Sequence, residues 1–268
     1  IRSICNSSYK NIEIIISNDG DISDELVSAL NEVKHSGEFY EITINVLFVE
    51  ENNGISHCRN LCIKNANGQY IMPLDGDDFI HENFIAEAMY VLLNHDDVAL
   101  VYSLTINYYQ EYNKMKPWVD VLYQEHEQIA ETQFIPSCQL YRKSGWEKIG
   151  GYDETLLSGW EDLDFNVRRV ALNQKFYRIN KFYFFYRMLK SSRTTNFHDS
   201  DRVVLRTKIE MMARNINIYA DNATQYLKFQ NYKDTKSRKR RSKLFIKFEF
   251  YRNYFRLRKI CDKYSTFD

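Results

Sequence analysis

Short apolar segments rich in β-branched residues alternate with segments of helical spacing through the first hundred residues. The run IEIIIS at 12–17 ends at the polar turn NDGD, as a buried strand does. Apolar residues at helical spacing follow in 24–34, and the alternating run ITINVLFVEE follows at 42–51. Strands and helices in this order bury their apolar faces by packing helices on a sheet. We therefore predict an α/β fold with a mainly parallel central sheet flanked by helices.

The alternation continues with a turn at Gly54 and a helix for which Ser56 is the expected N-cap. The next expected elements are a strand at 70–74, a helix at 82–94 and a strand at 98–103. The carboxyl ends of parallel strands meet at one edge of a sheet, where ligands of such folds bind. Asp19 and the acidic cluster that begins at Asp75 both follow strands, so we expect them at this edge.

The later part of the chain is less regular. Residues 105–133 are rich in tyrosine and only weakly periodic, so we expect a long surface excursion there. Helical spacing returns at 160–167 and again at 205–219.

The cysteines and the distribution of apolar residues argue against several classes of protein. No two of the 5 cysteines form a CxxC pair, which disfavours a disulfide framework and a structural zinc site. Cys58 and Cys62 share a helical face, and we expect both to be core thiols. No apolar run reaches the roughly 18 residues of a membrane-spanning helix. The opening IRSICNSSYK lacks the apolar stretch of a secretory signal.

The formal net charge of zero hides an uneven distribution of charge. From Lys233 to the end the chain carries 13 basic and 4 acidic residues, which leaves 23 basic and 32 acidic residues before it. As a helix, this segment would align Leu244, Phe248, Tyr251 and Phe255 on one face, with cations beside them. A basic, aromatic helix suits an anionic membrane surface. Packing on the rest of the protein and nucleic-acid binding are the alternatives.

Asp75, Asp77 and Asp78 lie within four positions at the end of an apolar segment. Carboxylates this close repel one another, and burying them unpaired is costly. A calcium EF-hand loop is excluded, because a loop that began at Asp75 would have Ile80 and Ala86 where glycine and glutamate are required. A solvated acidic turn and a Mg²⁺ or Mn²⁺ site shared with a diphosphate both stay open.

Glu161 and Asp162 follow Trp160 at the start of the helix expected there. They can be simple capping residues, because the helix dipole favours acids at the N-terminus. The alternative is a general base, a carboxylate whose pKa an apolar wall raises. Trp160 could supply that wall and also stack on a sugar.

Several segments in order resemble the family 2 glycosyltransferases, whose nucleotide-binding α/β fold is called GT-A. SYKNIEIIISNDG is similar to the region that leads to the family's nucleotide-contacting aspartate. NNGISHCRNLCIKNANGQYIMPLDGDD resembles its N-x-G-x-S-x-x-R-N segment and acidic metal motif. IGGYDETLLSGWEDLDFNVRR resembles its Gly-Gly-aromatic-Asp-Glu stretch and Glu-Asp motif, and FYRMLKSSRT resembles its closing Tyr-Arg segment.

The resemblance covers residues 1–195 and implies a domain organisation. A GT-A catalytic domain would span 1–200, with a nucleotide-sugar half up to residue 104 and an acceptor half from 105. A helical, basic extension would follow over 201–268. The family's first strand has no counterpart in this sequence, so the resemblance also implies a strand before Ile1.

The resemblance further implies roles for single residues. Those implied to bind the nucleotide sugar are Asp19, Arg59, Asp75 and Gly76. Arg59 can equally have a structural role, and Asp75 would contact either the ribose or the shell of the metal. Asp77 is implied to bind Mn²⁺ or Mg²⁺, and His198 is a second candidate ligand that can equally be an ordinary exposed histidine. Asp162 is implied to be the catalytic base, with Glu161 and Trp160 placing the acceptor.

The implied function is metal-dependent, inverting transfer of a sugar from a nucleoside diphosphate sugar, with a UDP-sugar as the expected donor. The acceptor would be a saccharide or a lipid-linked saccharide in surface polysaccharide or glycan synthesis. The protein would be cytoplasmic and peripheral at the inner face of the cell membrane, which residues 233–268 would contact, with no nucleic-acid partner. The alternative is a non-catalytic relative that binds nucleotide sugars or carbohydrate during assembly.

Overall fold

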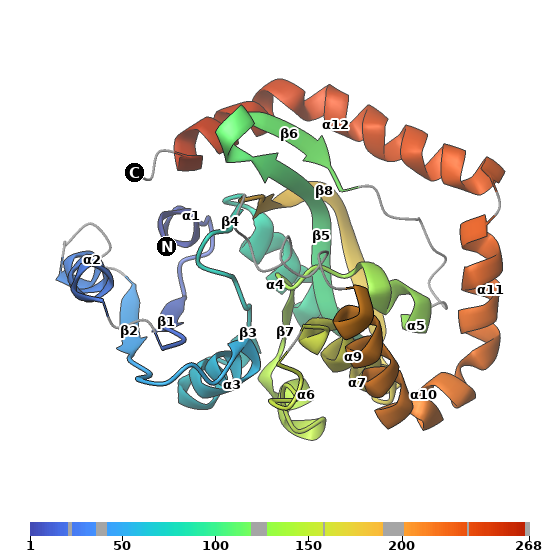
Figure 1. Cartoon of the computed structure of the whole chain (residues 1–268). Coiled ribbons are helices and arrows are strands. Elements are labelled where there is room, and N and C mark those ends of the chain that lie inside the picture. Colours follow the sequence, from blue (N-terminus) through green and yellow to red (C-terminus); the bar gives the residue numbers. More distant parts are fainter. Residues whose placement is uncertain are drawn as a thin grey trace.

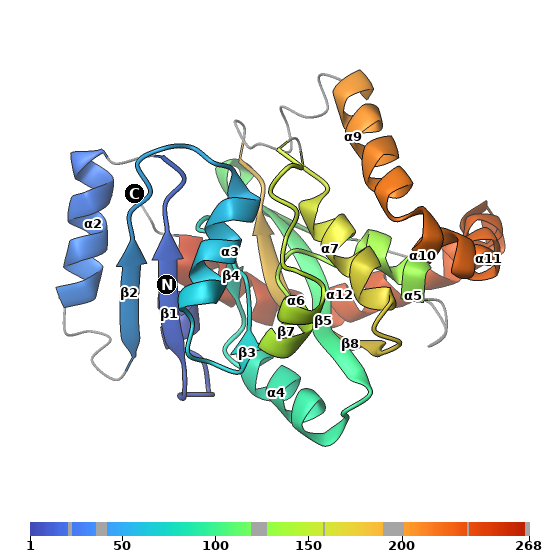
Figure 2. The same cartoon turned by 90° about the horizontal axis from the view of Figure 1, so that it is seen from below.

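The structure is a computed structural model that describes residues 1–20, 23–35, 42–118, 128–157, 159–189, 201–234 and 236–265. Its strands form two sheets (Figures 1 and 2). The smaller is a parallel pair of β1 (Glu13–Ser17) and β2 (Thr43–Leu47). The strands of the larger are β3 (Tyr70–Ile71), β4 (Phe79–Ile80), β5 (Val98–Tyr109), β6 (Lys114–Pro117), β7 (Leu140–Arg142) and β8 (Lys175–Arg187). Their order is β3-β7-β5-β8-β4, and β6 pairs with β5.

The predicted α/β class is confirmed, but the larger sheet is mixed rather than mainly parallel. Within it β5 and β8 run parallel, whereas the other described pairs are antiparallel. One cause is the short turn η1 (Gln110–Tyr112) between β5 and β6, since so short a connection joins only antiparallel neighbours. The strand predicted at 70–74 ends early at Ile71, and Pro73 follows, which has no N–H to donate to a neighbouring strand.

The surface excursion predicted at 105–133 is wrong for its first part. Residues 105–117 belong to β5, η1 and β6, and Ile106 and Tyr108 are almost fully buried. Most of β5 is covered on both faces, so its sequence lacks the alternation that marks a half-exposed strand. The structure then describes α5 (Gln128–Glu131) and η2 (Thr132–Phe134), while 119–127 lie outside the described residues.

Helices cover both sheets, as the predicted class requires. Those that precede residue 200 are α1 (Arg2–Cys5), α2 (Asp24–His35), α3 (Ile55–Asn65), α4 (Phe84–Asn94), α6 (Lys143–Lys148) and α7 (Glu161–Val170). The helix predicted at 82–94 is α4, and its residues Phe84, Ala88 and Leu92 are buried in the core. The N-cap of α3 is Gly54 rather than the predicted Ser56, whose side chain is buried within the helix.

The residues after 200 are helical where described, in α9 (Asp201–Arg214), α10 (Ile216–Asp221), α11 (Ala223–Asp234) and α12 (Lys236–Ser265). Helix α12 runs along the outside of β6 and β8 (Figure 1). One of its faces joins a core cluster with Phe182 and Phe185 of β8. The domain boundaries at 104 and 200 stay predictions. In the described part of the chain no helix is long and apolar enough to span a bilayer.

All 5 cysteines are free, as the absence of CxxC pairs indicated. Cys58 is buried and Cys62 is half-buried on α3. Burial raises the pKa of the Cys62 thiol to about 12, so this residue is inert at neutral pH.

Candidate functional site

The two sheets do not pair with each other through any described strand, and a cleft of about 1280 Å³ lies beside β1, α3 and the segment that joins β3 to β4. Figure 2 shows α3 beside β1 and β3. The residues predicted to bind the nucleotide sugar all line this cleft; they are Asp19, Arg59, Asp75 and Gly76. The structure therefore brings the predicted donor residues together at one place.

Asp19 follows β1 and holds the loop that leads into α3. Its Oδ1 accepts hydrogen bonds from the backbone N–H of Asn53 at 3.1 Å and of Gly54 at 3.0 Å. Gly20 makes this close approach possible, because it has a φ of +83° and an added Cβ would lie 2.7 Å from the backbone nitrogen of Asn52. Asp19 is thus fixed at the mouth of the cleft by the backbone of a neighbouring loop.

Arg59 projects from α3 and joins two predicted motifs. Its Nη2 donates to Asp75 Oδ1 at 2.9 Å, and its Nη1 donates to Glu161 Oε1 at 3.0 Å. The guanidinium also lies over the ring of Tyr152, 5.5 Å from its centroid. Arg59 is only 9% exposed, and a buried cation needs such partners to offset its lost hydration. The acidic motif and the Glu-Asp motif are therefore held side by side by one buried side chain.

The three carboxylates of the acidic cluster have different surroundings. Asp75 is paired with Arg59, whereas Asp77 has no hydrogen bond or ion pair to another described side chain. Burial and then the charge of Asp75 raise the pKa of Asp77. Asp78 lines the cleft but is only 5% exposed; its Oδ1 accepts the backbone N–H of Arg187 at 2.8 Å, and burial raises its pKa to about 8. Asp77 is thus the member of the cluster that is free to bind a ligand.

Arg187, at the end of β8, is a site residue that the sequence analysis did not single out. Its Nη1 donates to Gln110 Oε1 at 2.6 Å, and its Nη2 donates to the carbonyl oxygen of Tyr264 at 3.3 Å. Its charge lowers the pKa of Asp77 and Asp78 against the effect of burial. The Tyr-Arg segment was the available signal, but only the fold shows that β8 ends beside the acidic cluster.

Helix α7 begins at the Glu-Asp motif with a strained turn. Gly159 has a φ of +93°, and the N-cap Trp160 is left-handed with a φ of +67°. A non-glycine residue in that region costs about 1–3 kcal/mol and often marks a functional site. The turn aims Glu161 at Arg59 and leaves Asp162 half-buried next to it.

Asp162 has the properties of a general base near neutral pH. Burial, followed by the charge of Glu161, raises its pKa to about 6, while Arg59 opposes the rise. One carboxylate oxygen accepts the backbone N–H of Leu163 at 2.7 Å, which fixes the orientation of the group. Glu161 is 8% exposed and committed to Arg59, so Asp162 is the better placed of the two to take a proton.

Trp160, which was predicted to contact an acceptor, has neighbours within the protein. Its ring packs beside a cluster that includes Leu163, and the Nζ of Lys208 from α9 lies 5.0 Å from the ring centroid. This cation–π contact occupies one face of the ring, and stacking on an acceptor stays a prediction for the other.

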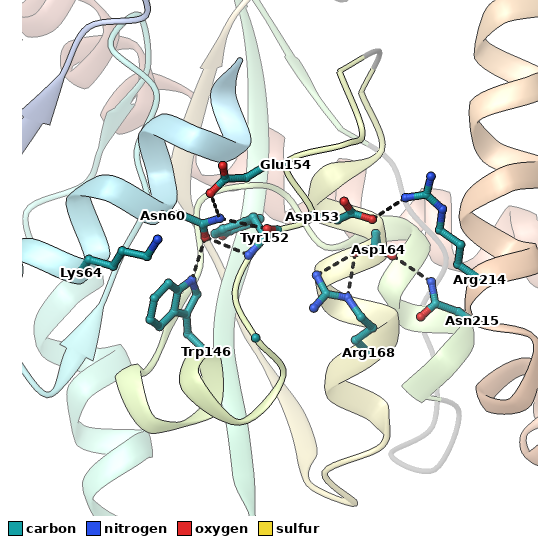
Figure 3. Close-up of a pocket in the computed structure, with 11 residues that line it drawn as sticks. Asn60, Lys64, Trp146, Tyr152, Asp153, Glu154, Asp164, Arg168, Arg214 and Asn215 are labelled. Atoms are coloured by element: carbon teal, nitrogen blue, oxygen red, sulfur yellow. Dashed lines mark hydrogen bonds and ion pairs between the residues drawn. The ribbon is translucent and has the colours of Figure 1, made fainter. Parts of the chain in front are cut away.

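A second cavity of about 470 Å³ is lined by residues from α3, α6, α7 and α9 (Figure 3). Asn60 makes four hydrogen bonds in the wall of this cavity. Its Nδ2 donates to the carbonyl oxygen of Tyr152 and to the carboxylate of Glu154, and its Oδ1 accepts the backbone N–H of Tyr152 and the indole N–H of Trp146. The loop comes this close because of Gly151, where an added Cβ would lie 2.8 Å from Asn60 Oδ1. The sequence analysis gave Asn60 no role of its own.

Four further hydrogen bonds hold α7 in place, and Figure 3 shows those that reach Asp164. Arg168 donates to Asp164 at 2.8 Å and to the carbonyl oxygens of Ile149 and Gly151. Asn215, at the junction of α9 and α10, donates to the other oxygen of Asp164 at 2.8 Å. Asp164 is therefore a structural residue of the Glu-Asp segment, whereas Asp162 faces the Arg59 bridge.

The described residues contain no group of three His, Cys, Asp or Glu side chains that could hold a metal ion alone. His198, the second predicted metal ligand, lies outside the described residues. Asp77, the first predicted metal ligand, is not among the residues that line the cleft, although its neighbours Asp75 and Asp78 are. Its carboxylate has no partner among the described side chains and so fits a hard cation that takes most of its ligands from a phosphate and water. An added Cβ at Gly76 would meet nothing within 4 Å, so the protein itself does not require glycine there.

Comparisons with known proteins agree with this arrangement. Residues 1–150 match the model of Glycosyl transferase family 2. The chain is 29% identical over 220 residues to glycosyltransferase GlyA of Streptococcus pneumoniae, an alignment that covers 72% of this chain and 28% of that protein. It is 29% identical over 185 residues to the uncharacterized glycosyltransferase YwdF of Bacillus subtilis, covering 68% of this chain and 64% of that one.

The fold is similar to that of S. aureus TarS. The structure of TarS 1-349 in complex with UDP-GlcNAc matches with a TM-score of 0.60 at 16% identity, over 85% of this chain and 68% of that one. A complex of the same protein with UDP matches with a TM-score of 0.55 at 17% identity, over 70% and 55% of the two chains. These matches confirm the predicted GT-A fold. The family match covers more than half of the sequence, so the chain belongs to glycosyl transferase family 2.

Proposed function

We propose that this chain transfers a sugar from a nucleoside diphosphate sugar to a hydroxyl group of a saccharide or lipid-linked acceptor. The observation that carries the proposal is the Arg59 bridge, which joins Asp75 in the cleft to Glu161 beside the candidate base. A donor in the cleft and a proton acceptor at Asp162 would thus be neighbours. The UDP and UDP-GlcNAc complexes of S. aureus TarS support a UDP-sugar as the first donor to test.

The reaction follows from the placement of these groups. Asp162 takes the proton of the acceptor hydroxyl as its oxygen forms a bond to the anomeric carbon. The bond from that carbon to the diphosphate oxygen breaks, and its electron pair leaves with the nucleoside diphosphate. Attack from the face opposite the leaving group makes this a single displacement, which inverts the anomeric configuration.

Asp77, with Asp75 beside it, would hold Mn²⁺ or Mg²⁺ together with the donor diphosphate. A bound cation would neutralise the charge that develops on the leaving diphosphate. The hydrogen bond from the backbone N–H of Arg187 to the Asp78 side chain ties the cluster to the end of β8. We place the reaction in surface polysaccharide or glycan synthesis, in the cytoplasm at the inner face of the membrane.

The test of catalysis is to measure nucleotide release from a panel of UDP-sugars, in the presence of a set of saccharide and lipid-linked saccharide acceptors, by the wild-type chain and by Asp162→Asn. Loss of the base should lower the rate by about 10²–10⁴-fold, while the melting temperature and donor binding stay unchanged. A variant as active as wild type would remove Asp162 from the mechanism. Donor binding without any turnover in the wild type would favour the alternative, a non-catalytic relative that binds nucleotide sugars during assembly.

The same panel tests the metal through the melting temperature, with Mn²⁺, with Mg²⁺ and with chelator. A nucleotide at 100 times its Kd stabilises the folded state by about 2.7 kcal/mol, which raises Tm by about 5–10 °C in a chain of this size. We expect this rise only with the cation, and we expect Asp77→Asn to abolish it. A rise that chelator and Asp77→Asn both leave intact would exclude a metal-dependent donor site at this cluster.

A further inference from the structure

Helix α12 has two opposite faces with different surroundings. The inner face contributes buried side chains to the core cluster of β5, β6 and β8: Ile246, Phe250, Leu257, Cys261 and Tyr264. These positions recur at helical spacing and define one side of the helix, where the half-buried Tyr254 and Ile260 also pack against the cluster. The helix is therefore anchored by one side and presents the other side outward, along the edge of the molecule (Figure 1).

The outward face carries three large aromatic side chains. Phe248 is 61% exposed, Tyr251 is 69% exposed and Phe255 is 83% exposed. Their spacing of three and four residues places them in one stripe along the helix. Single exposed aromatics are ordinary on protein surfaces, whereas a stripe of three on one helix marks an interaction surface.

Exposed cations accompany this stripe. Arg252 and Lys259 are exposed on the same side of α12, and Lys247 and Lys263 flank them. Arg256 is exposed as well, but its Nη2 lies 3.4 Å from Nε2 of His81. The acids of the described side chains of this helix are already paired, Glu249 with Arg252 and Asp262 with Arg258. The stripe and its cations thus form a surface, here called the basic aromatic face, that is complementary to a partner with negative charge and an apolar interior.

We propose that the basic aromatic face binds the surface of an anionic lipid bilayer. Aromatic rings favour the boundary between headgroups and acyl chains, and the cations beside them would contact anionic headgroups. Neither cavity described above is lined by α12, and nucleic-acid binding is therefore kept as an outcome of the test. The proposal does not rest on the sugar-transfer activity, because a bilayer bound here needs no nucleotide.

The experiment is flotation of the full chain with vesicles of phosphatidylcholine alone, and with vesicles that contain phosphatidylglycerol in equal part. We expect the protein to float with the anionic vesicles only, and less well as salt rises. Lys247→Gln combined with Lys259→Gln should weaken binding about 25-fold, at about fivefold for each cation near the surface. Phe248→Ser, Tyr251→Ser and Phe255→Ser together should weaken it more than about tenfold.

A matched control combines Tyr90→Ser on α4 with Lys148→Gln on α6. Both residues are exposed and lie off α12, so this variant should float like wild type. Melting curves of all variants should agree, because every altered side chain points into solvent. Flotation that the variants retain, or equal flotation with both kinds of vesicle, would overturn the proposal.

Two other partners of this face are distinguished by two further measurements. Binding to a single-stranded RNA oligonucleotide without flotation would assign the face to nucleic acid. A dimer in sedimentation that the three serine substitutions dissociate, again without flotation, would assign it to a second copy of the chain. Either result excludes the bilayer.

Discussion

At the scale of single residues, the buried guanidinium of Arg59 is the feature on which the candidate site depends. It neutralises the carboxylates of Asp75 and Glu161, which lie 86 positions apart, and it lowers the pKa of Asp162 against the effects of burial and Glu161. Removing one partner of a buried ion pair costs more than the pair contributes, because the other charges stay buried without compensation. Arg59 is therefore both a stabilising residue and a determinant of the protonation of the base.

We expect Arg59→Met to lower the free energy of unfolding by about 3–5 kcal/mol, measured by urea denaturation. The base works only when deprotonated, so the rate of nucleotide release should rise with pH through the pKa of about 6 in the wild type. Without the cation that pKa rises, and the rising limb should move to higher pH.

Arg59→Lys is the matched control for this prediction. It keeps the positive charge but a single ammonium cannot donate to both carboxylates with the geometry of a guanidinium. The rising limb should stay near its wild-type position while kcat/KM falls. An Arg59→Met protein with wild-type stability and an unshifted limb would contradict the electrostatic role.

At the scale of elements, the sequence predicts helices and strands where an apolar run or a helical period is clear. It misses them where a strand is buried on both faces and shows no alternation of apolar and polar residues. The strand at 12–17 and the helix at 82–94 were predicted because apolar runs and periods are local signals. The extension of β5 to Tyr109 was not, because residues covered on both faces show no alternation. The Arg59 bridge and the role of Arg187 could not be predicted either, since pairing over such distances depends on the tertiary fold.

The hydrogen bond from Asn215, at the junction of α9 and α10, to Asp164 of α7 also became visible only in the fold. It predicts that Asn215 stabilises the helix that carries the candidate base. Asn215→Ala removes hydrogen bonds to Asp164 and to the carbonyl of Met211. We expect a loss of about 1–3 kcal/mol in stability because a buried carboxylate loses a donor. Nucleotide release should slow as well, since α7 carries Asp162 at its start.

Asn222→Ala is the matched control, because the Asn222 side chain makes the same kind of bond to the carbonyl four residues earlier and no described contact with α7. Thermal melting of the two variants should show a smaller loss for Asn222→Ala, with unchanged turnover. Equal effects of both substitutions would mean that Asn215 only caps its own helix.

At the scale of the whole molecule, the helices after residue 200 share a core with the sheet. Helix α12 closes the side of β6 and β8, and α9 contacts the turn that begins α7. The basic segment was predicted to be an amphipathic helix, and its described part is one. Its buried face is the set at 246–264 rather than the stripe of Phe248, Tyr251 and Phe255, which the sequence alone could not distinguish as inner or outer.

Two alanine substitutions on α12 compare how much its buried face and its exposed face contribute to stability. Phe250→Ala, at a side chain that is 4% exposed, should cost about 3–5 kcal/mol of stability. Phe255→Ala, at a side chain that is 83% exposed, should change stability by less than about 0.5 kcal/mol. Urea denaturation of both proteins checks the prediction, and similar losses would mean that α12 is not docked by the inner face.

Arg187 connects the acidic cluster to the end of α12, and this connection has a consequence for regulation. Its backbone holds Asp78, and its guanidinium holds the carbonyl of Tyr264 in the last turn of α12. A ligand that draws this side chain toward the acidic cluster therefore alters the support of the helix that carries the basic aromatic face. Any resulting coupling is reciprocal. If a bilayer raises the affinity for a nucleotide by some factor, the nucleotide must raise the affinity for the bilayer by the same factor, and a chain loaded with nucleotide would be held more tightly at that surface.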